Sequence, residues 1–258
     1  MVGKVVQDRY RITGILGQGG MGAVYRAEQT AMGREVAFKM LRSEFGQDEQ
    51  LVERFQREAR NSARLEHPNT VRVFDFGRTT EGDLFLVMEL LSGQELADII
   101  GDGLDPHPVI HMARQIARSV AEAHNKGLVH RDLKPANVAV VSVEGDDKFV
   151  KVLDFGLAKL TQKEEGDEKD QSLTSAGAAL GTPLYMSPEQ CAGVKVDSRC
   201  DIYALGCIIF EMLVGRPPFV GQSAVMTMTM HIRDDVPGLD EARPDKALPV
   251  QLEQIIQK

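Results

Sequence analysis

Two polar loops joined by a pair of apolar segments constrain what this chain can fold into more than any other feature. The loops read His130-Arg131-Asp132-Leu133-Lys134-Pro135-Ala136-Asn137 and Asp154-Phe155-Gly156. Residues 138–141 and 149–153, which lie between the loops, are apolar and strand-like. If these two segments pair as a hairpin, Asp154 returns to the neighbourhood of Asp132 and Asn137. The sequence therefore predicts that two carboxylates, one carboxamide and one lysine meet at one place.

These residue types suit a metal-dependent phosphoryl transfer. Asn137 and Asp154 carry hard oxygen ligands of the kind that Mg²⁺ prefers. Asp132 can orient a hydroxyl nucleophile and accept its proton. Lys134 can neutralise charge on the group that is transferred.

Composition agrees with a globular protein and excludes other classes. The chain has 258 residues, 43% of them hydrophobic and 26% charged, enough for one large domain or two smaller ones. A net charge of −8 argues against nucleic-acid binding, which needs a basic patch. Three cysteines without CxxC spacing indicate buried, reduced thiols in a cytoplasmic setting. No signal peptide opens the chain, and the apolar residues 202–214 are too few to span a bilayer, so we expect no membrane contact from this chain.

The order of elements predicts an α+β fold with two lobes. Strand patterns and one amphipathic helix (residues 48–65) fill residues 1–91, and the expected strands are residues 10–12, 23–27, 35–40, 71–76 and 84–90. Helical patterns dominate residues 92–258, with helices expected at 109–125 and 202–214. The polar residues 162–171 read as a solvated loop.

Residues 17–24, Gly-Gln-Gly-Gly-Met-Gly-Ala-Val, match the pattern G-x-G-x-x-G-x-V. Taken alone, three spaced glycines could simply mark a tight turn, or they could be part of a dinucleotide-binding motif. The dinucleotide interpretation requires a helix directly after the glycines. Here a β-branched and aromatic segment follows instead, so we expect the glycines in a hairpin, where their backbone can approach phosphate oxygens closely.

Lys39 and Glu58 are expected to form an ion pair. Lys39 follows the apolar residues 36–38 of a strand, and taken alone it could be a surface lysine that extends its ammonium into water. Glu58, however, lies on the apolar face of the helix predicted over residues 48–65. A carboxylate that points inward needs a partner, and Lys39 is the natural candidate.

Together and in this order, the motifs resemble those of the eukaryotic-type (Hanks-type) protein kinases. Residues 181–189 match the end of the activation segment of that family, and residues 201–206 match the motif that opens a buried helix. Thr182 together with Lys134 resembles the serine/threonine branch. The Pro-Ala-Asn and Pro-Glu-Gln sequences resemble bacterial members. The resemblance covers nearly the whole chain and implies transfer of the γ-phosphoryl group of ATP to serine or threonine.

The resemblance also implies roles for individual residues. Four belong to the catalytic set, namely Asp132, Lys134, Lys39 and Glu58, while Asn137 and Asp154 hold Mg²⁺. His130 is expected to be structural, with its ring packed behind Phe155. Met88 would be the gatekeeper, the backbone of Glu89 and Leu91 would meet the adenine edge, and Glu95 would lie near the ribose. The full set expected around ATP is Leu16, Gly17, Gln18, Gly19, Gly20, Met21, Gly22, Ala23, Val24, Ala37, Lys39, Met88, Glu89, Leu91, Glu95 and Ala139.

The expected partners are protein substrates with serine or threonine hydroxyls, including a second copy of this chain phosphorylated in trans. Arg131 directly precedes Asp132, an arrangement that in this family couples the catalytic loop to a phosphorylated residue. Thr174 is the first candidate for that phosphate, followed by Ser175 and Ser172. Thr182 is the least favoured because its matched role is to bond Asp132 and Lys134.

Two alternatives belong to other functional classes. A pseudokinase-type nucleotide-binding or scaffold module would keep the fold without turnover, and it predicts the loss of Lys39, Asp132, Asn137 or Asp154. All four are present. A small-molecule kinase of related fold is disfavoured because residues 181–189 suit a peptide-docking surface.

The chain departs from the family pattern in two ways. Ser62 occupies a position where the family packs a larger apolar residue against the ring of Phe155, which predicts a looser alignment of the helix that carries Glu58. The sequence also stops at Lys258 within an amphipathic segment, before the arginine that pairs with Glu189 in the family. We therefore expect a C-terminally truncated kinase domain.

Overall fold

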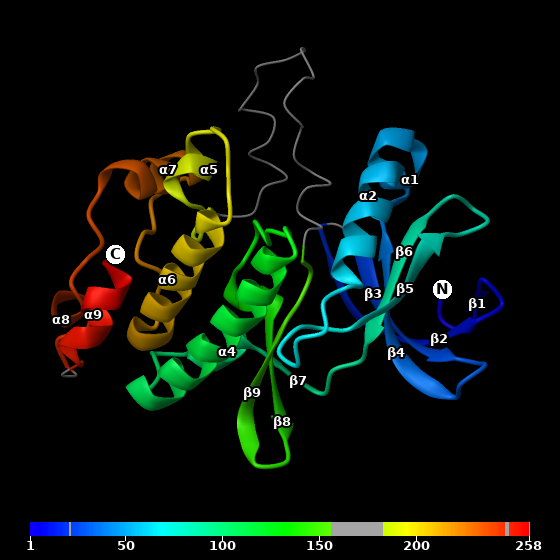
Figure 1. Cartoon of the computed structure of the whole chain (residues 1–258), viewed down its shortest axis with the longest axis horizontal. Helices are drawn as coiled ribbons and strands as arrows, with labels where there is room; N and C mark the ends of the chain where they lie inside the picture. Colours follow the sequence, from blue (N-terminus) through cyan, green and yellow to red (C-terminus); the bar gives the residue numbers. More distant parts are fainter. Residues whose placement is uncertain (21, 156–182, 246–247, 258) are drawn as a thin grey trace.

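The first lobe is an antiparallel sheet covered by helices, which confirms the predicted sheet and adds a short helix to the one expected. The computed structural model describes residues 1–20, 22–155, 183–245 and 248–257. Six strands pair in the order β1-β2-β3-β4-β6-β5. Their bounds are β1 Val5–Val6, β2 Tyr10–Gly19, β3 Gly22–Gln29, β4 Arg34–Leu41, β5 Val73–Arg78 and β6 Leu84–Glu89. Figure 1 shows this sheet beside a separate helical lobe.

Helix α2 (Glu49–Ser62) begins where the sequence provides a cap. The Asp48 carboxylate accepts hydrogen bonds from the backbone N–H groups of Gln50 and Leu51, which would otherwise lack a partner inside the helix. Val52, Phe55 and Ala59 on one face are buried against the sheet. The short helix α1 (Ser43–Gln47) precedes α2. It was not predicted, and neither was the two-residue strand β1.

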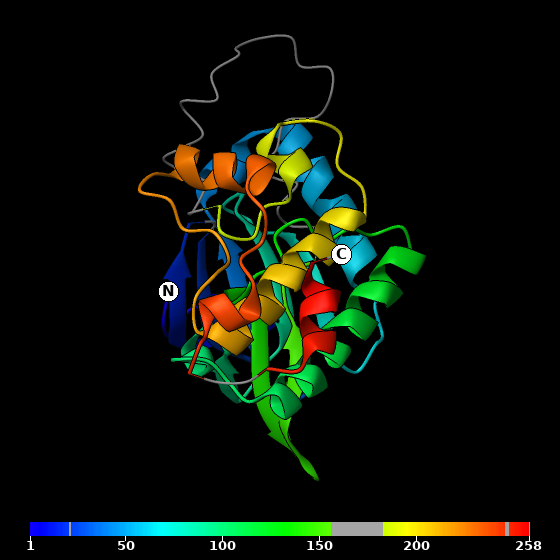
Figure 2. The ribbon, with the colours of Figure 1, turned by 90° about the vertical axis from the view of Figure 1, so that its left-hand side faces the viewer.

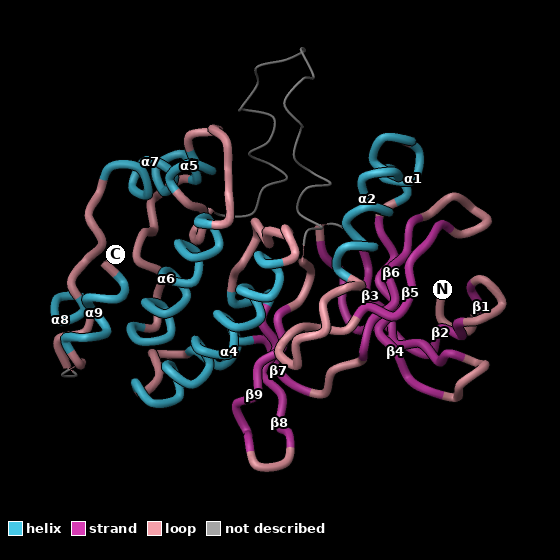
Figure 3. Tube along the Cα trace, viewed as in Figure 1, coloured by secondary structure: helices cyan, strands magenta, loops and turns pink. Residues whose placement is uncertain are grey.

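The second lobe is mainly helical, and Figure 3 shows its helices on the side away from the six-stranded sheet. Its helices are α3 Leu96–Ile100, α4 Pro106–Asn125, α5 Pro188–Cys191, α6 Arg199–Val214, α7 Ala224–Arg233, α8 Leu239–Ala242 and α9 Val250–Ile256. A smaller sheet has the order β7-β8-β9, with β7 Gly93–Glu95, β8 Val138–Val143 and β9 Asp146–Val152.

Helices α4 and α6 form the centre of the second lobe. Their buried residues, including Met112, Ile116 and Ile208, belong to one apolar cluster, onto which α9 adds Leu252. Figure 2 shows α4 (green), α6 (gold) and α9 (red) packed together. Helix α6 ends at Gly215, whose φ of 88° is accessible to glycine and costly for other residues. The predicted buried helix at 202–214 is therefore confirmed and starts three residues earlier.

The ends of several elements differ from the predicted ones for local reasons. Helix α4 starts at Pro106 rather than at residue 109, because proline is well suited to a first helical turn. Helix α2 ends at Ser62 rather than at residue 65. The predicted polar loop at residues 162–171 lies outside the described residues.

The two lobes are joined by more than the chain link after β6. The backbone N–H of Val71 donates to the carbonyl of Val152 at 2.9 Å, and that of Val152 donates to the carbonyl of Asn69 at 2.8 Å. The buried Asn69 side chain also donates to Gln115 of α4 at 2.7 Å. The segment after α2 is thus attached to the second lobe directly beside Asp154. Among the described residues, no helix has the length and apolar character needed to cross a bilayer.

Candidate active site

The first turn of α6 holds the loop that carries Asp132. The fully buried carboxylate of Asp201 accepts hydrogen bonds from the backbone N–H groups of His130 at 2.9 Å and Arg131 at 2.8 Å. It also contacts Nε2 of His124 at 2.7 Å. Arg131 has a φ of 66°, which is unfavourable for a residue other than glycine. Its carbonyl accepts from Nε2 of Gln190 in α5 at 2.9 Å, so side chains fix both of its backbone polar groups.

Asp132, Lys134 and Asn137 form one hydrogen-bonded group. The Lys134 ammonium lies 2.7 Å from Oδ2 of Asp132. The side-chain nitrogen of Asn137 donates to the Asp132 carbonyl at 2.7 Å and to its Oδ2 at 3.2 Å. Because Nδ2 of Asn137 is used in this way, its Oδ1 is the atom available to a ligand.

The hairpin of β8 and β9 brings Asp154 to this group, as predicted. Val138 pairs with Val152, and the N–H of Leu153 donates to the carbonyl of Asn137 at 2.9 Å. His130 fixes the next residues, because its Nε2 lies 2.8 Å from the Leu153 carbonyl oxygen. The ring centroids of His130 and Phe155 are 4.8 Å apart, so the packing expected between these two rings is confirmed.

Asp154 adopts a strained backbone and carries a charged side chain. Its φ is 56°, in the left-handed region. Burial pushes the pKa of Asp154 upward, but the Lys39 ammonium and its hydrogen bond, with further help from His130 and Lys134, outweigh burial and hold the pKa below its usual value. The carboxylate is therefore ionised at neutral pH and available as a ligand for a cation.

Lys39 pairs with Asp154 rather than with the expected Glu58. On β4 its side chain is buried, and Nζ lies 2.6 Å from Oδ2 of Asp154. Glu58 is fully buried on α2, with its Oε1 3.5 Å from Nε of Arg57. No contact between Lys39 and Glu58 occurs among the described residues. The attraction between an ammonium and a carboxylate weakens with distance. In this structure the Asp154 turn places its carboxylate in contact with Lys39, so the ion pair forms there.

The glycine-rich segment forms the predicted hairpin between β2 and β3, with Gly19 opposite Gly22. Gly22 has a φ of 150°, and a Cβ there would lie 2.0 Å from the Met40 carbonyl oxygen, so packing against β4 requires glycine. At Gly17, Gly19 and Gly20, by contrast, a Cβ would meet nothing within 4 Å. The space beside the backbone at these three positions is therefore open. Met21 lies outside the described residues.

The residues expected around adenine come from both lobes. Ala37 of β4 pairs with Met88 of β6, and Val24 and Leu91 pack against the apolar cluster to which both belong. Ala139 of β8 is buried and pairs with Glu95 of β7, which is exposed. Their expected role around adenine stays a prediction.

Sequence reasoning missed the residues that anchor the end of β6. Oε1 of Glu89 accepts from Nζ of Lys151 in β9 at 2.8 Å and from the backbone N–H of Arg72 at 2.7 Å. Lys151 lies three residues before Asp154. It was not singled out because the alternation of side chains along β9 indicates only that it faces outward from the strand. Gln190 was likewise noted only as part of a bacterial-type motif.

The end of the activation segment is held close to Asp132. Ser187 is the N-cap of α5 and forms a capping box with Gln190, whose side chain also reaches Arg131. Thr182, Thr174, Ser175 and Ser172 lie outside the described residues, as does Gly156. Their predicted roles stay predictions.

An antiparallel first lobe, a helical second lobe and this polar cluster between them define the protein-kinase class of fold. The family model described as "Protein kinase domain" matches residues 10–257. Serine/threonine-protein kinase pkn3 of Myxococcus xanthus is 41% identical over 257 residues, which are 99% of this chain and 46% of that protein. PrkC of Bacillus subtilis is 36% identical over 261 residues, or 100% of this chain and 38% of that protein. This chain belongs to the bacterial Hanks-type serine/threonine protein kinase family.

A solved structure agrees with the fold. The crystal structure of the Mycobacterium tuberculosis PknI kinase domain has a TM-score of 0.73 and 28% sequence identity, covering 99% of this chain and 88% of that chain. The present chain spans less than half the length of the curated relatives named above.

Proposed function

We propose that this chain transfers the γ-phosphoryl group of ATP to serine or threonine hydroxyls of proteins, in signal transduction and with a second copy of itself among the substrates. The observation that carries this proposal is that Asp132, Lys134 and Asn137 are hydrogen-bonded to one another, and that the N–H of Leu153, next to Asp154, donates to the carbonyl of Asn137. A nucleotide-binding or scaffold module without turnover would not need Asp132 to be oriented by both Lys134 and Asn137.

The residues present fit Mg²⁺. Oδ1 of Asn137 and the ionised Asp154 carboxylate are hard oxygen donors from two adjacent loops. When bound, Mg²⁺ supplies neutralisation of the charge on phosphate oxygens. We expect these two side chains to hold it.

The residues of the chain divide the remaining work. The open space beside Gly17, Gly19 and Gly20 would admit the phosphates of ATP. Because glycine has no Cβ, the backbone there could approach the phosphate oxygens closely. Lys39, which contacts Asp154 in this structure, would neutralise phosphate charge from β4, and the segment from Met88 to Leu91 would bind adenine. Asp132 would orient the substrate hydroxyl and accept its proton, while Lys134 neutralises charge on the transferred group.

The setting that we propose is the cytoplasm, where ATP and protein substrates meet. Cys191, Cys200 and Cys207 are free and buried, which is typical of a reducing compartment.

Phosphate incorporation from labelled ATP tests the proposed function. Purified protein is incubated with ATP and Mg²⁺, alone and with a generic basic protein, and the same mixtures are repeated with a chelator and with Asp132→Asn. We expect serine and threonine phosphorylation only in the complete wild-type mixtures. Nucleotide binding without any phosphate transfer would instead identify a binding module.

A further inference from the structure

A hydrogen bond links α2 to the turn that carries Asp154. Ser62, the last residue of α2, is 7% exposed, and its Oγ donates to the carbonyl oxygen of Phe155 at 2.7 Å. The two residues are 93 positions apart in sequence. In the family an apolar side chain packs against Phe155 at this position. Here the hydroxyl of Ser62 makes a hydrogen bond to Phe155 instead.

The Asp154–Phe155 turn needs such fixation because its backbone is strained. A non-glycine residue with a φ of 56° persists only where surrounding contacts hold it. Lys39 holds the Asp154 carboxylate, and His130 holds the Phe155 ring and the Leu153 carbonyl. The bond from Ser62 adds a contact to the Phe155 backbone itself, and the bond is buried.

We propose that Ser62 is a positioning residue for the metal-binding turn, an inference that rests on the proposed function and deepens it. By holding the Phe155 carbonyl, its hydroxyl keeps Asp154 in the conformation in which the carboxylate contacts Lys39. The same bond couples the turn to α2, and therefore to Glu58, which lies one helical turn before Ser62 on the same buried face.

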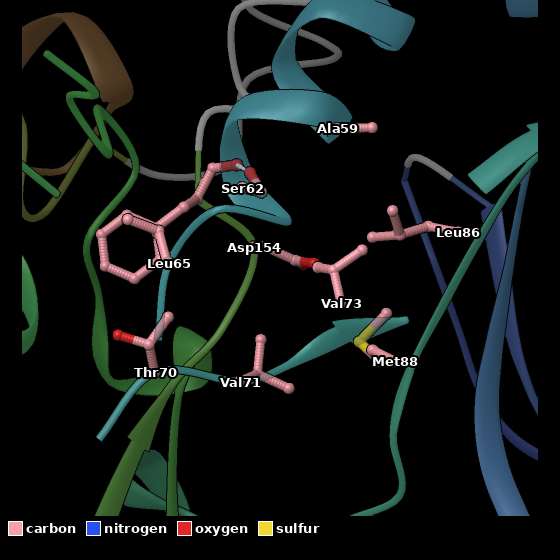
Figure 4. Close-up of a pocket in the computed structure, with 10 residues that line it drawn as sticks. Ala59, Ser62, Leu65, Thr70, Val71, Val73, Leu86, Met88 and Asp154 are labelled. Carbon is pink, nitrogen blue, oxygen red and sulfur yellow. Dashed lines mark hydrogen bonds between the residues drawn. The ribbon is translucent and has the colours of Figure 1, made fainter. Parts of the chain in front are cut away.

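The surroundings of Ser62 allow the hydroxyl to be tested separately from side-chain size. Figure 4 shows Ser62 at a pocket between α2, β5, β6 and Asp154. Its other lining residues are Ala59, Leu65, Thr70, Val71, Val73, Leu86, Met88 and Phe155. The pocket has a free volume of about 10 Å³, which is close to the space that one water needs and too small for an organic ligand. Variants at position 62 are therefore compared in pairs of equal size that differ only in the hydroxyl.

Threonine and valine at position 62 have the same shape and differ in the hydroxyl. We expect Ser62→Thr to keep the affinity for ADP with Mg²⁺ within about threefold of wild type. Ser62→Val and Ser62→Ala should each lower it about tenfold, which corresponds to about 1.4 kcal/mol, the scale of one buried hydrogen bond. Affinity for ADP without Mg²⁺ should change by less than about twofold, because the turn contributes the metal ligand rather than the adenine contacts. Calorimetric titration of each variant with ADP, with and without Mg²⁺, measures both.

Thr227→Val is the matched control. Thr227 is fully buried in α7, and its hydroxyl accepts from the N–H of Gly221 at 3.0 Å and donates to the Ser223 carbonyl at 3.2 Å. The Thr227→Val variant loses a comparable buried hydroxyl far from the Asp154–Phe155 turn in sequence, and it should bind Mg²⁺·ADP like wild type. Equal affinities in Ser62→Thr and Ser62→Val, or equal losses with and without Mg²⁺, would overturn the proposal, and Ser62→Ala carries the comparison if Ser62→Val does not fold.

The outcome also separates this proposal from the proposed function. If wild type binds ADP in a Mg²⁺-dependent way and shows the hydroxyl dependence, but transfers no phosphate, only the proposed function fails. If it transfers phosphate and the hydroxyl has no effect, only the role of Ser62 fails. Nucleotide affinity that is independent of Mg²⁺ in wild type would overturn the role of Ser62 outright.

Discussion

At the scale of single residues, the site is organised around the carboxylate of Asp132. One of its oxygens, Oδ2, accepts hydrogen bonds from the side chains of both Lys134 and Asn137. These bonds fix the direction of the side chain and leave Oδ1 as the atom that can accept a proton from a hydroxyl. An asparagine at this position could keep much of the geometry but could not act as a base.

Asp132→Asn should therefore reduce turnover by roughly 100-fold or more, the scale of a positioned general base, with little change in the affinity for Mg²⁺·ADP. Steady-state kinetics and calorimetric titration of the same preparation measure the two effects. Turnover near that of wild type would show that Asp132 is not the base.

Lys39→Met should abolish phosphate transfer while the protein stays folded, because methionine keeps the volume of the lysine stem. Glu58→Gln, made for comparison, should lower activity less. Loss of the ammonium also removes the main cause that holds the pKa of Asp154 below its usual value, so that pKa should rise in Lys39→Met.

The stability of the same variant has a definite pH dependence. A carboxyl whose pKa is lowered in the folded state stabilises it above the ordinary pKa of 3.8, and that contribution is lost as pH falls through the folded value. Urea unfolding should therefore show Lys39→Met about 1–3 kcal/mol less stable than wild type at pH 7, with the difference shrinking below pH 4. A difference that is independent of pH would mean that the ion pair does not set the pKa of Asp154.

At the scale of elements, the loop before Asp132 is joined to α5 and α6 through Arg131. Its backbone is fixed by Asp201 and Gln190, while its buried Nε has no hydrogen-bond partner among the described residues. A guanidinium held in this way suits a phosphate group, which carries about −1.5 to −2 charge and accepts paired hydrogen bonds from arginine.

We predict that phosphorylation of the activation segment, at Thr174 before Ser175 or Ser172, raises activity through this guanidinium. Thr174→Ala and Arg131→Ala should each impair turnover, and the double variant should be little worse than either alone. Mass spectrometry after incubation with ATP and Mg²⁺ identifies the modified residue. A fully active protein with an unmodified segment would exclude this switch and leave the role of Asp132 untouched.

At the scale of the whole molecule, the three thiols report on the integrity of the second lobe. Burial, aided by the Glu189 carboxylate, raises the pKa of Cys191 to about 11. Burial raises the pKa of Cys207 to about 12, and burial together with Asp201 also raises that of Cys200. Thiolate, the reactive form, is therefore scarce in the folded protein.

Iodoacetamide at pH 8 should leave all three thiols of the native protein largely unmodified over minutes, and should label all three in denaturant. The extent of labelling, followed by mass spectrometry across a urea series, should match the unfolding transition of the second lobe. Rapid labelling of one thiol in the native protein would show that its surroundings open locally.

The sequence by itself determined the parts of the site that depend on short stretches of chain. The hairpin of β8 and β9 returns Asp154 to Asn137 because both strands and both loops lie within 25 residues, from His130 to Asp154. Capping residues such as Asp48 and Gly215 likewise determine the ends of helices through contacts with their own neighbours.

Only the tertiary structure decided how distant elements share their charges and hydrogen bonds. Two buried or partly buried carboxylates, Glu58 and Asp154, were possible partners for Lys39. The placement of α2 relative to the Asp154 turn brings Asp154 into contact with Lys39. The bonds from Ser62 to Phe155 and from Lys151 to Glu89 also join segments more than 60 residues apart. No local pattern encodes such pairings, because a side chain's periodicity gives the face on which it lies and not the atom that it meets there.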